Sequence, residues 1–326
     1  MLDLEYQKRI LDWIPKQIFD MHNHVGLPRH HSILTAERKR SCIGVSIAYS
    51  QAIGKLEKIF KLLLPGIKLN YVAFPFPFIE TKIKEANNYA LKCENPFVLG
   101  NLDNPKETSE LLRISRVKGL KVYHDFIKKD YTKISILDFL PETFLYELNK
   151  SFKPVMLHVK ISPVDDYKNI SELNYIFEKF PKIRIILAHM GGCQTKMDVV
   201  NASRKLKQSG NIFLETSTVS SPDVFEEAII RFGTEHILYG SDSPYTFTKG
   251  KIMAAPGEIQ NKFITEKRFP WTKRDDRKWY LNNKPELTFL LYHQLDVMGA
   301  VFKNLDIKKK DLEKIFYWNA IKVLNI

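Results

Sequence analysis

Short apolar runs rich in β-branched and aromatic residues alternate with stretches of helical spacing from residue 17 to about residue 245. Several runs, such as Ile183–Ala188, are almost continuously apolar, as expected for strands that are covered on both faces. Alternation of this kind predicts a parallel sheet whose strands are joined by right-handed helical crossovers. The fold is thereby restricted to an open doubly wound sheet or a closed barrel.

Nine runs have the character of strands, whereas a closed (β/α)8 barrel needs eight. We therefore expect one of the runs at 42–49, 69–74 and 97–102 to be additional or not a strand. No Gly-x-Gly-x-x-Gly motif follows any run, which argues against a dinucleotide-binding open sheet. We predict an α/β fold, a (β/α)8 TIM barrel with an inserted loop or helical segment after the last strand.

Residues 246–284 break the alternation, since they are polar and irregular and contain Trp271 and Trp279. We expect a lid or insertion over one end of the barrel, where loops at the carboxyl ends of the strands build active sites. A peripheral decoration is the alternative. The whole chain, residues 1–326, is predicted to be a single domain.

The charge balance limits the choice of partners. The chain has 50 Lys and Arg against 37 Asp and Glu, a net charge of +13. The lysines are spread along the sequence, and no RNP, zinc-finger or basic-zipper pattern occurs. We predict a solvated, lysine-rich surface and no nucleic-acid partner.

The cysteines and the hydropathy bear on the compartment. Cys42, Cys93 and Cys193 are far apart, odd in number and without a Cys-x-x-Cys motif, which favours a reduced intracellular environment. No stretch approaches the ~20 apolar residues of a membrane span. We see no signal-peptide pattern at the N-terminus. We therefore expect a cytoplasmic protein with no membrane partner.

The segment Phe19–His24 is predicted to be a buried strand that ends in a His-x-His pair. Residues two apart in a strand point to the same side, so Asp20, His22 and His24 would share one face. Two neutral imidazoles on one face can bind a single metal ion such as zinc. The pair alone is a weak signal, and its meaning depends on the other strands.

Four more polar residues stand at the carboxyl ends of apolar runs. They are Lys121, His158, His189 and Asp242. In a parallel barrel all of these strand ends converge on one face. Four histidines and one aspartate at successive strand ends predict a metal-hydrolase site there.

These pieces resemble the amidohydrolase superfamily and, within it, the amidohydrolase-related group of aminocarboxymuconate-semialdehyde decarboxylase and pyrone-dicarboxylate lactonase. The resemblance runs over most of the chain, is weakest at 40–115 and 246–284, and does not specify a substrate. The matching segments are DMHNH at 20–24, His158, AHMGG at 188–192, GSDSP at 240–244 and EKIFYWNAIKVL at 313–324.

The resemblance implies a divalent metal, most often Zn²⁺, with Mn²⁺ or others accepted. By position, His22, His24, His158 and Asp242 would be the ligands, and His189 a further ligand or a residue that polarises the substrate or handles a proton. Such a metal lowers the pKa of a bound water toward ~7. Asp242 and His189 would then be catalytic, Asp242 as the acceptor of that proton.

Lys121 is ambiguous in this family. In some members a lysine at this place is carboxylated and bridges two metals, whereas in the lactonase a basic residue here binds a substrate carboxylate. A plainly exposed lysine is the third alternative. If Lys121 points inward, so does Tyr123, and the two would bind substrate, while His124 would fall on the other face. As a free cation, Lys121 would suit an anionic small molecule.

The first hypothesis is a metal-dependent hydrolase that cleaves a C–N or C–O bond of a small carbonyl compound with a metal-activated water. The alternative is a non-oxidative decarboxylase of an unsaturated or aromatic carboxylic acid. A catalytically silent binding or scaffold barrel is a third hypothesis, against which the complete ligand set argues. A homodimer is expected from the family resemblance alone. Asp20 is expected either to orient a ligand histidine or to bond to backbone.

Overall fold

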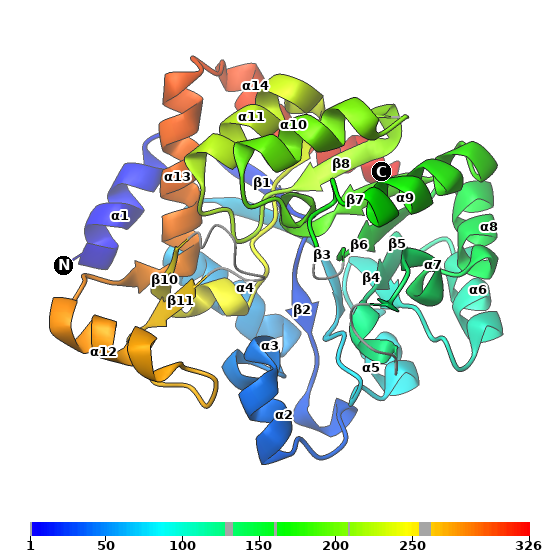
Figure 1. Cartoon of the computed structure of the whole chain (residues 1–326), viewed down its shortest axis with the longest axis horizontal. Coiled ribbons are helices and arrows are strands. Elements are labelled where there is room, and N and C mark those ends of the chain that lie inside the picture. The colour runs from blue at the N-terminus through cyan, green and yellow to red at the C-terminus, as the bar shows by residue number, and fades with distance from the viewer. Residues whose placement is uncertain (1, 128–132, 160–161, 208, 254–261) are drawn as a thin grey trace.

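The computed structural model describes residues 2–127, 133–159, 162–207, 209–253 and 262–326. Eight parallel strands form a nearly closed barrel with helices around it (Figure 1). This confirms the predicted (β/α)8 architecture. In order of adjacency the strands are β1 (Gln17–Asp20), β3 (Lys68–Pro75), β4 (Asn95–Leu99), β5 (Gly119–Val122), β6 (Pro154–Leu157), β7 (Arg184–Leu187), β8 (Ile212–Glu215) and β9 (Ile237–Leu238).

The barrel closes between β9 and β1 through separate hydrogen bonds. The Met21 N–H donates to the Tyr239 carbonyl oxygen at 2.9 Å, and the Asp242 N–H donates to the His22 carbonyl oxygen at 2.9 Å. Just beyond β1, the short strand β2 (His24–Val25) pairs with β3. The His-x-His segment and the segment that contains Asp242 are therefore neighbours along this closure.

Strand residues alternate between the barrel interior and the layer under the helices. Met156 of β6 and Ile186 of β7 pack in the interior cluster, whereas their neighbours Val155 and Ile185 belong to the larger cluster shared with the helices. Every residue of β5, β6 and β8 is buried. Burial on both faces explains why these strands are continuous apolar runs rather than alternating ones.

The predicted helices form around the barrel, several with a side-chain cap at the first residue. Asn104, Thr195 and Ser221 each accept a backbone N–H from the first turn that follows, which satisfies a donor that the helix leaves free. The helices are α1 (Leu2–Leu11), α4 (Ile53–Leu63), α5 (Ile83–Ala90), α6 (Pro105–Arg113), α7 (Ile136–Phe139), α8 (Glu142–Ser151), α9 (Tyr167–Lys179), α10 (Lys196–Lys205), α11 (Pro222–Phe232), α13 (Leu290–Asn304), α14 (Lys309–Glu313) and α15 (Asn319–Leu324).

The run at 42–49 is the strand candidate that is not a strand. It forms the short helix α3 (Ile43–Ile47), which follows α2 (Ala36–Ser41). Only Val45 within α3 is buried, while Ile43 and Ile47 line a cavity. A short apolar run has no decisive periodicity, and the apolar residues here border the cavity instead of a sheet.

The segment after β9 contains a small sheet that lies beside the barrel (Figure 1). In this sheet β10 (Lys249–Met253) pairs antiparallel with β11 (Lys262–Thr265) and with β12 (Thr288–Phe289). The helix α12 (Arg274–Asn283) accompanies it. The predicted insertion at 246–284 thus has secondary structure of its own, although its part 254–261 lies outside the described residues. Its role as a lid stays a prediction, as does the single-domain interpretation.

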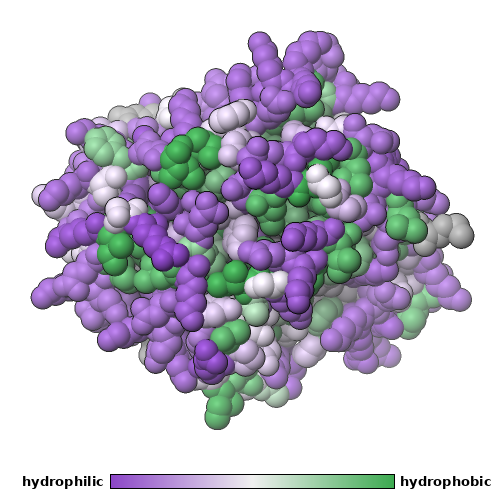
Figure 2. All heavy atoms as spheres, turned by 180° about the vertical axis from the view of Figure 1, so that it is seen from behind, coloured by the Kyte–Doolittle hydropathy of each residue, from purple (hydrophilic) through white to green (hydrophobic). Residues whose placement is uncertain are grey.

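The surface is largely hydrophilic on one face of the molecule. On the face shown in Figure 2, hydrophilic residues cover most of the area, and apolar residues appear between them in separate groups. None of the described helices combines the length and the hydropathy required to cross a membrane. The three cysteines are free thiols.

Candidate metal centre and substrate pocket

One cavity of about 550 Å³ opens at the carboxyl ends of the strands, within the size range of small-molecule sites. Its lining includes every site residue that the sequence predicted. These are His22, His24, Lys121, Tyr123, His158, His189 and Asp242.

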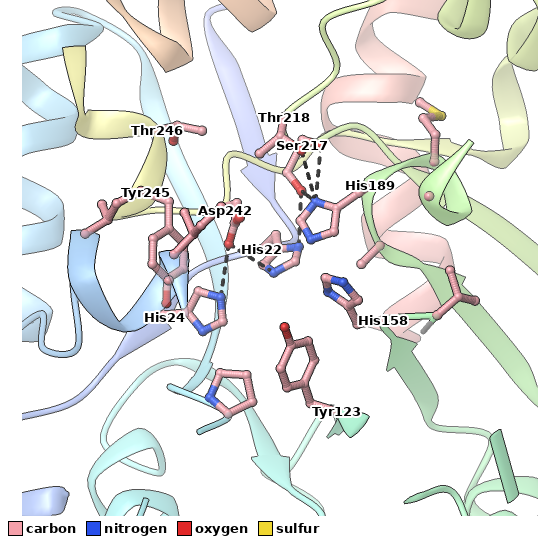
Figure 3. A pocket seen from close by; sticks show the side chains of 18 of the residues that line it. His22, His24, Tyr123, His158, His189, Ser217, Thr218, Asp242, Tyr245 and Thr246 are labelled. Atoms are coloured by element: carbon pink, nitrogen blue, oxygen red, sulfur yellow. Dashed lines mark hydrogen bonds and ion pairs between the residues drawn. The ribbon is translucent and has the colours of Figure 1, made fainter. Parts of the chain in front are cut away.

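Three of the four predicted metal ligands lie within contact of one another. Oδ1 of Asp242 is 3.3 Å from Nε2 of His22 and 3.0 Å from Nε2 of His24 (Figure 3). All three side chains are buried, and their donor atoms are close enough to hold one metal ion. Asp242 has a φ of 59°, a left-handed conformation that costs a non-glycine residue roughly 1–2 kcal/mol. Such strain is typical of functional sites.

The imidazoles have the protonation state that a metal requires. Burial lowers the pKa of His22 well below its ordinary value, and the nearby Lys121 ammonium lowers it further. Burial also lowers the pKa of His24, although Asp242 opposes this change. Both rings are therefore neutral near pH 7 and can each offer a lone pair, so the donor set fits a divalent metal.

Glu215, which the sequence analysis did not identify, fixes the orientation of His22. Its Oε2 lies 2.9 Å from Nδ1 of His22 and accepts the Ser217 hydroxyl at 2.7 Å and the His189 N–H at 3.2 Å. Its Oε1 accepts the Ser217 N–H at 2.5 Å. With Nδ1 engaged by the carboxylate, His22 turns Nε2 toward Asp242. Burial raises the pKa of Glu215 to about 8, an effect that the hydrogen bonds from the Ser217 hydroxyl and from the backbone N–H groups of Ser217 and His189 oppose.

A signal for Glu215 is present in the sequence. The residue ends the apolar run Ile212–Glu215, so it obeys the same rule that identified His158 and Asp242. The glycine of the Gly-Ser-Asp motif also leaves space for the Glu215 side chain. A Cβ atom at Gly240 would lie 2.0 Å from Oε1 of Glu215. A residue without a side chain at this position leaves room for the carboxylate.

Asp20 takes the second of its two expected roles. Its Oδ1 accepts the backbone N–H groups of His22 at 3.0 Å and Ser241 at 2.9 Å. These bonds join the backbone of the two segments at the barrel closure. The imidazole ring of His22 is oriented by Glu215 instead.

His189 sits on a left-handed turn after β7. The φ angles of His189, Met190, Gly191 and Gly192 are 55°, 53°, 67° and 71°. Gly191 is required here for space as well, because a Cβ atom would approach Cγ1 of Val164 to 2.9 Å. The turn brings the His189 ring to 5.1 Å from the His22 ring, centroid to centroid. Burial lowers the pKa of His189 below its ordinary value.

His158, the fourth predicted ligand, lies beside His189 and Tyr123 in the cavity. Its ring centroid is 4.8 Å from that of His189 and 4.7 Å from that of Tyr123. It is absent from the two closest groups of donors among the described residues, one of His22, His24 and Asp242, the other of His22, His189 and Glu215. Its role as a ligand stays a prediction.

Lys121 is buried, with 1% of its surface exposed, which excludes the plainly exposed alternative. Among the described residues its Nζ has no hydrogen-bond partner, and it lies 5.1 Å from the centroid of the Phe74 ring. Burial lowers its pKa to about 8, whereas Asp242 and Glu215 oppose the change. Lys121 is therefore a largely protonated cation near pH 7 that faces the cavity.

The remaining lining is mixed. Tyr123 points its hydroxyl group toward the histidines (Figure 3). His124 also lines the cavity, contrary to strand alternation, because the chain leaves β5 after Val122 and enters a 3-10 turn. Arg38 borders the cavity too, but its guanidinium pairs with Glu80 and Asp125. Apolar walls are supplied by Ile43, Ile47, Phe78, Val219, Phe263 and Leu290.

The comparison with known families decides the affiliation. Residues 99–326 match the family model described as amidohydrolase. The chain belongs to the amidohydrolase family. It is accordingly an enzyme, and the metal dependence of that family agrees with the donor set at His22, His24 and Asp242. No curated protein matches the sequence.

Solved structures of similar fold include both hydrolases and decarboxylases. A 2,6-dihydroxybenzoate decarboxylase from Rhizobium is 16% identical, with a TM-score of 0.57 over 95% of this amidohydrolase and 98% of that chain. An amidohydrolase from Burkholderia multivorans with bound zinc is 9% identical, with a TM-score of 0.59 over 95% and 99%. A dihydroxybenzoic acid decarboxylase from Polaromonas with manganese and 2-nitroresorcinol is 14% identical, with a TM-score of 0.53 over 95% and 97%. At these identities the likeness concerns the fold.

Proposed function

We propose that this chain is a metal-dependent hydrolase that cleaves a C–N or C–O bond of a small carbonyl compound. The observation that carries the proposal is the group of three buried donor atoms, Nε2 of His22, Nε2 of His24 and Oδ1 of Asp242, at one end of a cavity. Zinc is the proposed metal, because two neutral imidazoles and a carboxylate are typical zinc ligands. The cytoplasm is the proposed location, and a homodimer the proposed assembly, both on the sequence arguments alone.

In this proposal His22, His24 and Asp242 would hold the metal, and His158 is the predicted fourth ligand. A divalent metal bound there supplies Lewis acidity, which polarises a carbonyl group and lowers the pKa of water. Asp242 is placed to accept the proton that the attacking water loses. Glu215 keeps His22 in the orientation that the metal needs.

We propose a single metal. The second donor group would require a lone pair from Glu215, whose two oxygens already accept hydrogen bonds from His22, His189 and Ser217. A second cation at that place would have to displace these bonds. Without a second metal there is nothing for a carboxylated lysine to bridge, so Lys121 keeps its amine.

The substrate is proposed to carry an anionic group that pairs with Lys121. A buried ammonium without a partner is costly, and a substrate carboxylate would relieve that cost. Arg38, the other described cation of the lining, is already paired. Tyr123 is a neighbouring hydroxyl that could also contact the substrate. The apolar walls near Phe78 and Leu290 suit its hydrocarbon part.

Non-oxidative decarboxylation of an unsaturated or aromatic acid is the second candidate. It is favoured by the same cation at Lys121 and by the two similar structures that are decarboxylases. The two reactions differ in their product. An assay that follows both substrate loss and CO2 release distinguishes them, with acids, esters, lactones and amides as candidate substrates. If CO2 forms in the same amount as the acid is consumed, decarboxylation replaces hydrolysis as the proposed reaction.

Metal content of freshly purified protein, prepared without chelators and measured by elemental mass spectrometry, tests the metal centre. We expect about one equivalent per chain, lost in His24→Ala and Asp242→Ala. His236→Ala is the matched control, because this histidine bonds to the Ile212 carbonyl oxygen in the turn that precedes β9 and does not line the cavity. Two equivalents would support a bridging, carboxylated Lys121. Full activity without metal would overturn the proposal.

A further inference from the structure

The hydroxyl group of Ser217 lies between the histidines of the pocket and Glu215. Its Oγ is 2.7 Å from Oε2 of Glu215, 2.8 Å from Nδ1 of His189 and 3.3 Å from Nδ1 of His22. Ser217 is fully buried and follows β8 by two residues. It therefore contacts both rings and the carboxylate. Its hydroxyl group has a single proton, so it can donate to only one of these groups and must accept from another.

The single proton of the hydroxyl is committed to the carboxylate. Oε2 of Glu215 also receives the backbone N–H of His189 at 3.2 Å, and Oε1 receives the backbone N–H of Ser217 at 2.5 Å. Backbone N–H groups can only donate, and with Nε2 of His22 facing the metal that it would hold, Nδ1 of His22 carries a proton that it also donates to Oε2. These donors and a metal cation nearby favour the carboxylate form of Glu215 in the metal-loaded enzyme, and both oxygens then act as acceptors. The Ser217 hydroxyl donates to Oε2, and its oxygen is left to accept from His189.

The surroundings of Nδ1 of His189 then fix the position of the ring proton. The Ser217 oxygen accepts at 2.8 Å, and the Ser217 carbonyl oxygen, which can only accept, lies at 3.4 Å. The Thr218 hydroxyl, 3.3 Å from Nδ1, can donate or accept, whereas the carbonyl oxygen and the Ser217 hydroxyl, whose proton goes to Glu215, can only accept there. These two acceptors place the ring proton on Nδ1. In a neutral imidazole Nε2 is then unprotonated. Figure 3 shows that the ring turns this nitrogen away from Ser217, toward the space bordered by His22 and His158.

We propose that Ser217 is a positioning residue that holds His189 as the Nδ1-protonated tautomer and leaves Nε2 bare toward the pocket. The proposal deepens the proposed function and rests on it for its chemical meaning. In this state His189 accepts a proton from water or substrate. It can protonate a leaving group only after it has gained a proton itself.

The tautomer decides between the roles that the sequence left open for His189. A neutral ring with a bare Nε2 cannot donate a hydrogen bond to a substrate carbonyl oxygen, so polarisation of the substrate by this residue is excluded in the resting enzyme. A decarboxylase needs a proton donor for the carbon atom that loses CO2. A resting His189 that accepts protons fits hydrolysis, in which the attacking water supplies the proton.

The tautomer is measured directly on the full-length, zinc-loaded protein labelled with ¹⁵N-histidine. A two-dimensional ¹H–¹⁵N correlation at about pH 8, above the ordinary histidine pKa of ~6.5, shows which ring nitrogen carries the proton. The spectrum of His189→Asn identifies the resonances of His189 by their loss. The variants are Ser217→Ala, Ser217→Thr, which keeps a hydroxyl, and the control Ser203→Ala, whose hydroxyl bonds to the Val200 carbonyl oxygen on α10.

We expect the proton on Nδ1 in the wild type, in Ser217→Thr and in Ser203→Ala. In Ser217→Ala the ratio of tautomers should shift by about tenfold toward Nε2–H, the value of one net hydrogen bond. If Ser217→Ala does not fold, Ser217→Cys keeps the size with a weaker acceptor and should shift the ratio in the same direction.

A wild-type His189 protonated at Nε2, or a ratio unchanged in Ser217→Ala, would overturn the proposal. Zinc content of the same samples separates this result from a failure of the metal centre. A wild type that binds no zinc contradicts the proposed function, whereas the tautomer of its His189 still tests the role of Ser217.

Discussion

The two sides of the pocket differ in how completely their polar groups are paired. On the side of β8, Glu215 accepts four hydrogen bonds, and His22, His189 and Ser217 are joined through it. On the side of β5, the Lys121 ammonium is just as deeply buried but has no hydrogen-bond partner within the described part of the chain. We call the Glu215 group the satisfied wall of the cavity and the Lys121 ammonium its unsatisfied wall.

This difference separates two tasks. A satisfied network holds its side chains in one arrangement before any ligand arrives, which is what a metal ligand and a proton acceptor require. An unsatisfied buried charge makes the folded protein less stable until a partner of opposite charge binds. The first wall is therefore built to fix geometry, and the second to select a substrate.

The largest effect is expected at Asp242, which contacts His22 on the satisfied side and acts electrostatically on Lys121. Asp242→Ala removes a metal ligand and the proposed proton acceptor together. We expect kcat/KM for the first hydrolysed substrate to fall on the order of 10³-fold. Asp103→Asn, a change in an exposed loop, is the control. A loss of less than tenfold would remove Asp242 from the reaction.

The unsatisfied wall is tested by Lys121→Met. Because the folded-state pKa of Lys121 is about 8 and its ordinary value is 10.5, the buried charge destabilises the native state fully below pH 8. This cost disappears as pH rises from 8 to 10.5. Metal-free Lys121→Met should therefore be more stable than wild type by roughly 3 kcal/mol at pH 7, with the difference vanishing near pH 10.5.

Urea unfolding at a series of pH values measures this difference, with Lys106→Met on the exposed face of α6 as control. A variant less stable than wild type at pH 7 would show that Lys121 is paired after all, and the contrast between the two walls would be lost. We also expect Lys121→Met to bind anionic ligands more weakly than the wild type and neutral ligands with the same affinity.

The satisfied wall is tested by Glu215→Gln, which keeps the shape of the side chain. The amide presents an NH₂ group where His22, His189 and Ser217 all need acceptors. Zinc affinity, measured by competition with a chromophoric chelator, should fall about 10–100-fold, as is usual when the partner of a ligating histidine is removed. An unchanged affinity would mean that Glu215 is only a structural residue.

A smaller effect is expected when the space next to the Glu215 carboxylate is filled from the backbone at Gly240. In Gly240→Ala the new Cβ atom would lie 2.0 Å from Oε1 of Glu215, so the carboxylate tip must shift. We expect a loss of about 1 kcal/mol in the free energy of unfolding, at the lower end of overpacking effects because only the end of a side chain moves. Gly54→Ala, at the start of α4 with open space around it, should be neutral or slightly stabilising.

The sequence was sufficient where strand geometry alone decides position. His158, His189 and Asp242 stand at the ends of apolar runs, and the convergence of parallel strands brought them to one cavity. Glu215 obeyed the same rule and could have been found. Their chemical roles stay predictions.

The positions that could not be read from the sequence lie where the chain has left the strands. His124 and Ser217 come after the last residues of β5 and β8, so the alternation of side chains no longer applies to them. Asp20 was expected to share a face with His22, but it does not line the cavity, and its carboxylate accepts backbone N–H groups at the barrel closure. The helix at Ile43–Ile47 has too few residues for its period to be distinguished from that of a strand.

Few backbone hydrogen bonds join β9 to β1, so the local unfolding of the barrel at this closure should depend on ligand binding. His22 and His24 belong to one edge and Asp242 to the other, and the edges are joined by single bonds such as Met21 N–H to Tyr239 O. A metal ion bound by the three side chains would therefore link the two edges of the barrel and stabilise the closure. Chelation should therefore speed amide hydrogen exchange at Met21 and Asp242, while the continuous ladder between β6 and β7 keeps its protection.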